Sequence, residues 1–88
     1  MNNKENGTHP AYVKRVGAVR LAVWEKEAAE GRIFHNVSIL RRYKDGEEWK
    51  DSSTFNGLSD LASLKEALAH VTAWISHRED SIAQEGEE

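Results

Sequence analysis

The fold is decided by residues 32–56, which read RIFHNVSILRRYKDGEEWKDSSTFN. In residues 32–43 the odd positions are mostly apolar and the even positions are mostly polar. This alternation is typical of a strand with one face on a core and the other face in solvent. Residues 44–46, Lys-Asp-Gly, have the composition of a tight turn in which the glycine adopts the left-handed conformation. We therefore predict a β-hairpin with a three-residue loop and a second strand over residues 48–56.

The loop length sets the register of this hairpin, and the register decides which side chains share a face. With three loop residues, Tyr43 faces Glu47 and Arg41 faces Trp49. Odd-numbered residues of the two strands then lie on the same side of the sheet. The register therefore predicts an apolar side that contains Val37, Ile39, Trp49 and Phe55.

Two further strands precede this hairpin. Residues 12–16 form a short alternating segment that suits an edge strand, and Gly17 interrupts it as a bulge or bend would. Residues 18–26 alternate cleanly and place their valines and Leu21 on one face, and residues 27–31 form a loop. The sequence thus predicts a four-stranded antiparallel meander whose first strand is short.

An amphipathic helix follows the sheet. Gly57 ends the last strand, and Ser59 or Asp60 can cap a helix because a short side-chain oxygen accepts hydrogen bonds from the free amides of the first turn. Ser63 and Glu66 form a second capping pair, so the helix can also begin one turn later. Apolar residues then recur at spacings of three and four over about five turns. They are Leu61, Leu64, Leu68, Val71 and Ile75, and Trp74 widens the stripe.

This stripe is wider than one face of a small sheet needs, and it predicts a helix-mediated homodimer with these six residues at the interface. The fold class is α+β, a four-stranded meander followed by one C-terminal helix, in one domain over residues 12–79. Residues 1–11 are polar without apolar periodicity and residues 80–88 are acidic, so we expect both segments to be disordered.

Composition excludes several functional classes. The chain has no Cys, which excludes a disulfide scaffold and a cysteine nucleophile and fits a reducing cytoplasm. His70 and His77 lie about 10 Å apart along a helix, which is too far for one metal ion. No apolar run reaches the roughly 18 residues of a membrane span, and the polar first residues lack a signal-peptide core. We expect no enzyme activity, no cofactor, no metal, no membrane contact and no small-molecule substrate.

The net charge of −3 is distributed unevenly. Residues 12–58 hold nine Lys and Arg against seven Asp and Glu, whereas residues 59–88 hold two against seven. The predicted sheet is therefore mildly basic and the C-terminal part is acidic. Such a distribution is typical of a binding face with an acidic tail, and also of charges that merely face solvent.

The sheet face away from the helix carries rings, cations and small polar groups. Alternation and the basic turn assign to it Arg20, Trp24, Phe34, Asn36, Arg42, Lys44 and Lys50. Single-stranded nucleic acid needs aromatic rings for base stacking and cations for its phosphates, so these seven are the candidate nucleic-acid-binding residues. An ordinary solvent-facing sheet also carries Arg, Ser and Asn, and a dimer contact or a tail can equally cover Trp24.

The layout resembles the C-terminal domain of the eukaryotic transcriptional coactivator positive cofactor four, over about residues 12–78. The most specific stretch is SILRRYKDGE at residues 38–47, followed by LASLKE at residues 61–66. The chain is also similar to small bacterial proteins with the motifs that here read VRLAVW at residues 19–24 and YKD…WKD at residues 43–51. The resemblance implies a homodimer whose curved sheets bind single-stranded DNA. It places Arg20, Trp24, Arg42 and Lys50 where basic and aromatic residues are expected.

We predict a non-catalytic homodimer in the cytoplasm that binds single-stranded DNA or RNA with little sequence preference, and the resemblance favours DNA. The alternative is a protein–protein adaptor or inhibitor of the same fold that does not bind nucleic acid. The acidic C-terminal part favours the adaptor, and the cations and rings on one sheet face favour nucleic-acid binding.

Overall fold

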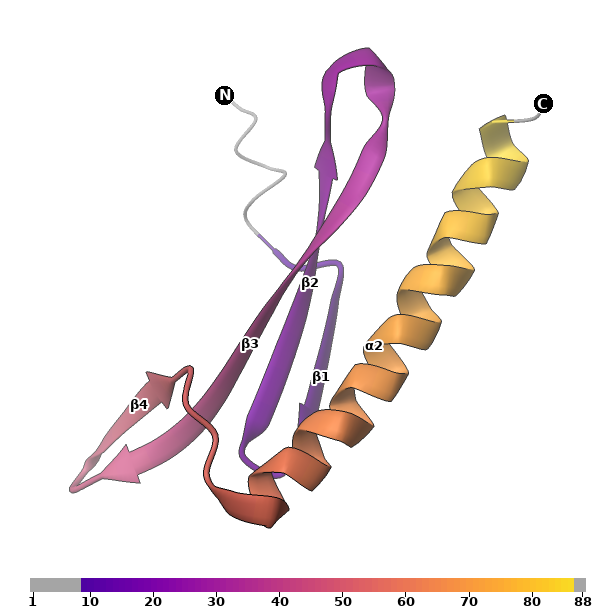
Figure 1. Ribbon diagram of the computed structural model, residues 1–88. Helices are drawn as coiled ribbons and strands as arrows, with labels where there is room; N and C mark the ends of the chain where they lie inside the picture. Colours follow the sequence, from indigo (N-terminus) through magenta and orange to yellow (C-terminus); the bar gives the residue numbers. More distant parts are fainter. Residues whose placement is uncertain (1–8, 87–88) are drawn as a thin grey trace.

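A computed structural model describes residues 9–86 of the chain (Figure 1). Its elements are β1 (Tyr12–Val16), β2 (Val19–Glu27), the short 3-10 turn η1 (Ala29–Gly31), β3 (Ile33–Asp45), β4 (Glu48–Ser52) and α2 (Gly57–Gly86). The four strands form one antiparallel sheet in the order β1-β2-β3-β4. The predicted α+β fold, a four-stranded meander followed by one C-terminal helix, is confirmed.

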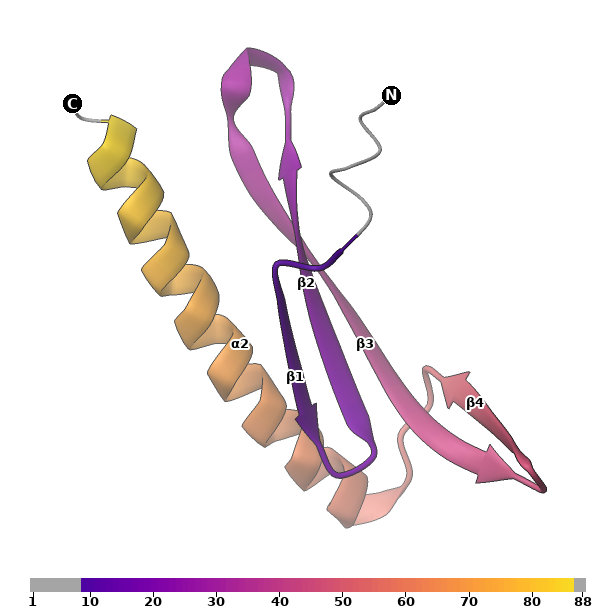
Figure 2. The same cartoon turned by 180° about the vertical axis from the view of Figure 1, so that it is seen from behind.

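The helix lies on one face of the sheet. It packs against β1 and β2, and Figures 1 and 2 show β4 at the opposite edge of the sheet, away from α2. We call the sheet face that points toward α2 the helix side and the opposite face the open face. One helix covers only part of the helix side, and it leaves the open face without a covering element among residues 9–86.

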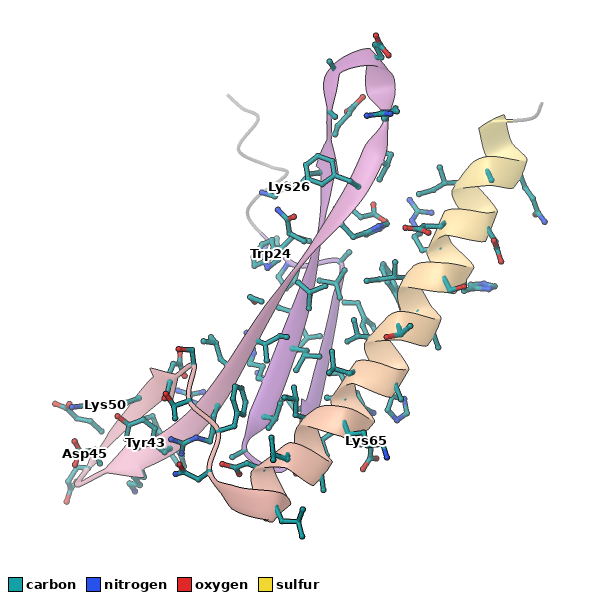
Figure 3. The ribbon with its side chains drawn as sticks, viewed as in Figure 1. Trp24, Lys26, Tyr43, Asp45, Lys50 and Lys65 are labelled. Carbon is teal, nitrogen blue, oxygen red and sulfur yellow. The ribbon has the colours of Figure 1, made fainter. Side chains whose placement is uncertain are left out.

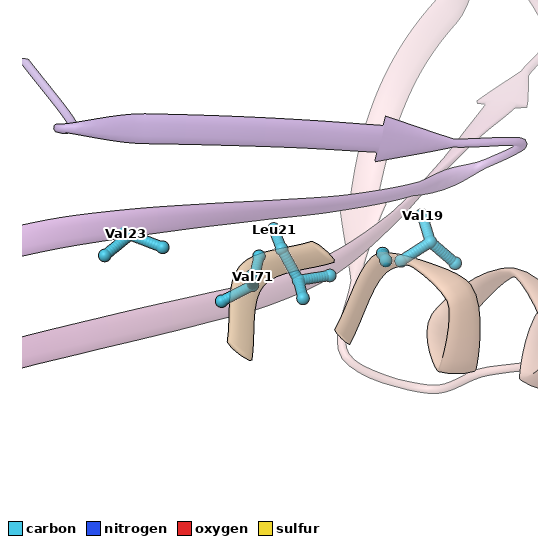
Figure 4. Close-up of a cluster of buried hydrophobic side chains, with 5 residues drawn as sticks. Val19, Leu21, Val23 and Val71 are labelled. Atoms are coloured by element: carbon cyan, nitrogen blue, oxygen red, sulfur yellow. The ribbon is translucent and has the colours of Figure 1, made fainter. Parts of the chain in front are cut away.

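The core lies between β2 and the middle of α2. Val19, Leu21 and Val23 are fully buried, and they meet Ala67 and Val71 of the helix (Figure 4). The alternation of residues 18–26 therefore predicted the central strand correctly, because each valine or leucine on one face is separated by one residue from the next.

The outer part of the predicted core is less buried than expected. Ile39 and Phe55 pack against the central cluster and are partly buried. Val37 lies on the helix side but stays 37% exposed, because α2 packs on β1 and β2 rather than across β3. Val37 therefore lies on the predicted apolar side, but the helix does not cover it.

The bend expected at Gly17 is a complete hairpin turn. Val16 pairs with Val19, which leaves Gly17 and Ala18 as a two-residue loop. Gly17 has a φ of 56°, as the first position of a type II′ turn requires. A Cβ atom at Gly17 would lie 2.9 Å from Oγ of Ser63, so the turn packs tightly against α2.

The β3–β4 hairpin has a shorter loop than predicted. Asp45 pairs with Glu48, so two residues rather than three form the loop, and Gly46 takes its first position with a φ of 66°. Removing one loop residue shifts the register by one and turns every side chain of β4 to the other face. The predicted register is wrong: Lys44, not Arg41, faces Trp49.

The ends of the domain also differ from expectation. Helix α2 begins at Gly57, two residues before the first expected cap, and Asp60 accepts a hydrogen bond from the Asn56 amide at 2.8 Å. It continues to Gly86, so residues 80–86, expected to be disordered, are helical. In the expected disordered lead, the Ala11 amide donates to the Val23 carbonyl at 2.7 Å and extends the pairing of β1. Residues 1–8 of this lead lie outside the described residues.

Candidate nucleic-acid interface

Pairing across the strands identifies every residue of the open face. Directly paired residues point to the same side of a sheet, and neighbours along a strand point to opposite sides. The open face therefore consists of Val13, Arg15, Arg20, Ala22, Trp24, Lys26, Phe34, Asn36, Ser38, Leu40, Arg42, Lys44, Trp49 and Asp51. Six of the seven predicted nucleic-acid-binding residues lie on it.

Lys50 is the exception. It pairs with Tyr43 on the helix side, and its Nζ lies 3.1 Å from a carboxylate oxygen of Asp45. Figure 3 shows these residues at the β3–β4 hairpin. The predicted place of Lys50 on the open face is wrong, because the two-residue loop exchanges the two faces of β4.

The charge of the sheet is separated between its two faces. On the open face of the four strands, five cations stand against one acid, Asp51. On the helix side of the same strands, three cations stand against four acids. The open face is therefore markedly more basic than the net charge of −3 suggests. A local positive field of this kind attracts polyanions.

Two aromatic rings form a platform near the β2–β3 end of the open face. Trp24 pairs with Asn36, and Phe34 pairs with Lys26, so Trp24 and Phe34 are diagonal neighbours. Such neighbours stand about 7–8 Å apart, within reach of large rings. Phe34 is 45% exposed, Trp24 is half-buried, and Figure 3 shows Trp24 and Lys26 on the side away from α2. We call Trp24 and Phe34 the distal platform.

A third ring, Trp49, stands at the other end of the open face. It is 58% exposed, and the Arg42 guanidinium and the Lys44 ammonium lie 5.5 and 5.7 Å from its ring centroid. Both cations thus lie within cation–π distance of the indole. The single acid of the face, Asp51, lies 4.0 Å from Nε of Arg42. We call Trp49, Arg42 and Lys44 the hairpin platform.

An ion cluster on the helix side holds the distal end of the sheet against α2. The Arg78 guanidinium donates to the Glu25 carboxylate, and Nε2 of His35 lies 3.2 Å from the same carboxylate. The hydrogen bond from Arg78 outweighs the effect of burial and lowers the pKa of Glu25 below its ordinary value. Trp74 stacks on Tyr12 at 5.2 Å and meets His35 edge-on. These contacts fix the β2–β3 hairpin that carries the distal platform.

The predicted dimer residues divide into two groups. Val71 is buried in the core, Leu64 and Ile75 pack against it, and Trp74 stacks on Tyr12. These four residues therefore serve the fold of one chain. Leu61 and Leu68 remain 52% and 37% exposed.

The two exposed leucines lie on the flank of α2 that faces β3. Leu61 and Glu79 are 18 residues apart, and this separation equals five turns at about 3.6 residues per turn, so both point in the same direction. The Glu79 carboxylate lies 3.9 Å from Nδ1 of His35 in β3. Val37 is exposed on the helix side of that strand. We call Leu61, Leu68 and Val37 the apolar flank.

Among the aromatic and cationic residues of the open face, Arg15, Lys26 and Trp49 were missed in the sequence prediction. Arg15 and Lys26 follow from the same alternation that located Arg20 and Trp24, so the sequence contained their signal. Trp49 was placed on the opposite face because its position depends on the loop length, which the residues Lys44-Asp45-Gly46 alone did not determine.

Among residues 9–86, no cluster of three or more His, Asp and Glu side chains is arranged to hold a metal ion. The one long helix of this part of the chain is too polar to cross a membrane.

Comparisons with protein-family models, with curated proteins and with solved structures found no match. The similarity to the positive cofactor four family therefore stays a prediction from the sequence.

Proposed function

We propose that this protein binds single-stranded nucleic acid, DNA or RNA, on its open face without catalysing a reaction. The observation that carries the proposal is the composition of that face: three aromatic rings and five cations against one acid. Rings stack on bases of any sequence, and cations neutralise phosphates, so the expected binding has little sequence preference.

Single strands suit this face better than a duplex does. The rings of Trp24, Phe34 and Trp49 project from a sheet, and a base can stack on them only when it is free of its own helical stack. A duplex reader usually inserts a basic helix into the major groove. Helix α2 is acidic, with Lys65 and Arg78 as its cations, which argues against that mode.

We also propose that two copies of the chain associate through the apolar flank. Leu61, Leu68 and Val37 are apolar residues that one chain leaves exposed, the two leucines on α2 and Val37 on the helix side of β3. An 88-residue domain buries a small core, and burying these residues against a second copy adds to its stability. A dimer joined on the helix side leaves both open faces free for nucleic acid.

The proposal places the protein in the cytoplasm, where single-stranded nucleic acid is present and a chain without Cys fits the reducing conditions. A protein–protein adaptor of the same fold remains the second candidate, because the exposed Leu58, Leu61 and Leu68 of α2 offer apolar surface to a partner. The two candidates differ in one readily measured property, the affinity for an oligonucleotide.

Fluorescence anisotropy with a labelled oligothymidylate tests the function. Trp24→Ala should weaken binding by about 1–3 kcal/mol, the usual contribution of one base–aromatic stack, and to a similar extent for other base sequences. Lys65→Ala, exposed on α2, is the control and should bind like the wild type. Circular dichroism must show that both variants are folded. Equal affinities of the two variants would contradict nucleic-acid binding at the distal platform.

A further inference from the structure

A hollow opens on the sheet beside the hairpin platform. Its volume is about 400 Å³, and its walls are Gly17 and Ala18 of the β1–β2 turn, together with Arg42 and Trp49. Small-molecule sites occupy about 300–1,000 Å³, so this hollow is at the small end and suits a single nucleoside unit.

The backbone holds the two walls of the hollow in place. The Arg42 amide donates to the Ala18 carbonyl at 2.8 Å, which fixes the β1–β2 turn against β3. Trp49 belongs to β4, which pairs with the edge of β3 opposite to β2, and its direct partner there is Lys44. The paired strands therefore hold the backbone from which the indole projects. Gly17 and Ala18 add almost no side-chain volume, and the exposed indole is therefore open to a planar ligand.

We propose that this hollow is a second stacking site, in which a nucleic-acid base lies on the Trp49 indole while Arg42 and Lys44 hold the adjacent phosphates. The inference rests on the proposed function and adds to it a site separate from the distal platform. The Asp51 carboxylate lies 4.0 Å from Nε of Arg42, so an exposed ion pair stands next to the cation beside the ring.

The distance between the two sites sets the length of strand that can use both. Trp24 pairs with Asn36 and Trp49 pairs with Lys44, and these partners are eight residues apart along β3. At about 3.4 Å per residue the separation is about 27 Å. Three nucleotide steps span only about 20 Å even at twice the stacked rise of about 3.4 Å. A tetranucleotide therefore reaches one site, whereas a strand of about twelve nucleotides reaches both.

The test uses fluorescein-labelled oligothymidylates of about four and about twelve nucleotides, with the full chain and anisotropy as the readout. Two variants disrupt the hollow in different ways. Trp49→Ala removes the ring, and Ala18→Leu fills the space while leaving the ring and both cations in place. Lys50→Ala is the matched control, because Lys50 follows Trp49 in β4 and points to the opposite face.

We expect each disrupting variant to weaken binding of the longer oligonucleotide about 5- to 150-fold, the equivalent of one base stack. Binding of the tetranucleotide should fall by at most about twofold, because the distal platform still accepts it. Lys50→Ala should match the wild type with both probes.

Two outcomes separate this inference from the function on which it rests. If the wild type binds neither probe, the proposed function fails and the second site fails with it. If the wild type binds the longer probe and Trp24→Ala weakens it while Trp49→Ala and Ala18→Leu do not, the function stands and the second site is refuted. An equal loss for both probe lengths would also refute it, since that result describes one site and not two.

Discussion

Val71 and Leu68 lie one turn apart on α2, and we expect them to respond very differently to truncation. Val71 is 2% exposed in the core, whereas Leu68 is 37% exposed on the apolar flank. Val71→Ala removes two buried methyl groups, for which transfer alone costs about 1.6 kcal/mol at about 0.8 kcal/mol each. The cavity left beside Leu21 raises the expected loss to about 2–3 kcal/mol.

Thermal and urea unfolding measure this loss. A domain of this size loses about 4–8 °C in Tm for each kcal/mol, so Val71→Ala should lower the Tm by about 10–20 °C. Leu68→Ala should cost about 1 kcal/mol in the monomer, and more at protein concentrations at which a dimer buries this side chain. Equal losses for the two variants at every concentration would refute the division between core and apolar flank.

Three further perturbations address the turn, the ion cluster and the dimer. Gly17→Ala should lower the free energy of unfolding in urea by about 1–3 kcal/mol more than Gly46→Ala does. Both glycines have a positive φ, but only a Cβ at Gly17 meets another side chain, with Oγ of Ser63 at 2.9 Å. If adding Ser63→Ala to Gly17→Ala does not recover part of the difference, this contact is refuted. The pKa of Glu25 is lowered in the folded state by the hydrogen bond from Arg78, so the stability from this group is complete above the unfolded pKa and is lost as pH falls through the folded pKa. Glu25→Gln should therefore flatten the acid limb of a plot of stability against pH, and an unchanged limb would contradict this assignment. In sedimentation equilibrium, Leu61→Asp should convert the proposed dimer to a folded monomer, because the dimer would bury its charge. Ala69→Asp, which is also exposed on α2, should leave the dimer intact. A wild type that is monomeric at high micromolar concentration would rule out the dimer.

The sequence was sufficient to predict the element order and most of the open face. Alternation in residues 18–26 and 32–43 determines which residues share a face, whatever the exact strand ends, so Arg20, Trp24 and Phe34 were placed correctly. The spacing of apolar residues likewise located the helix and its buried stripe around Val71.

The sequence predictions are wrong at two points. The face of each β4 side chain depends on one residue of loop length, and the burial of β3 depends on where the helix packs on the sheet. Lys44-Asp45-Gly46 suits a three-residue loop, and the actual loop of Gly46 and Glu47 differs by a single residue, yet it exchanges Trp49 and Lys50 between faces. Val37 alternates like a core residue, and it stays exposed because the helix packs on β1 and β2. Local patterns carry no information about where along a sheet a helix will lie.

The salt dependence of oligothymidylate binding tests the central claim most directly. With five cations on the open face and a slope of about −0.7 per phosphate contact, the logarithm of the affinity should fall linearly with the logarithm of the salt concentration, with a slope of up to about −3.5. Arg20→Ala and Arg42→Ala should each reduce that slope by about 0.7, and Lys65→Ala should leave it unchanged. Absence of any anisotropy change with wild-type protein at low salt would contradict the account and favour the adaptor instead.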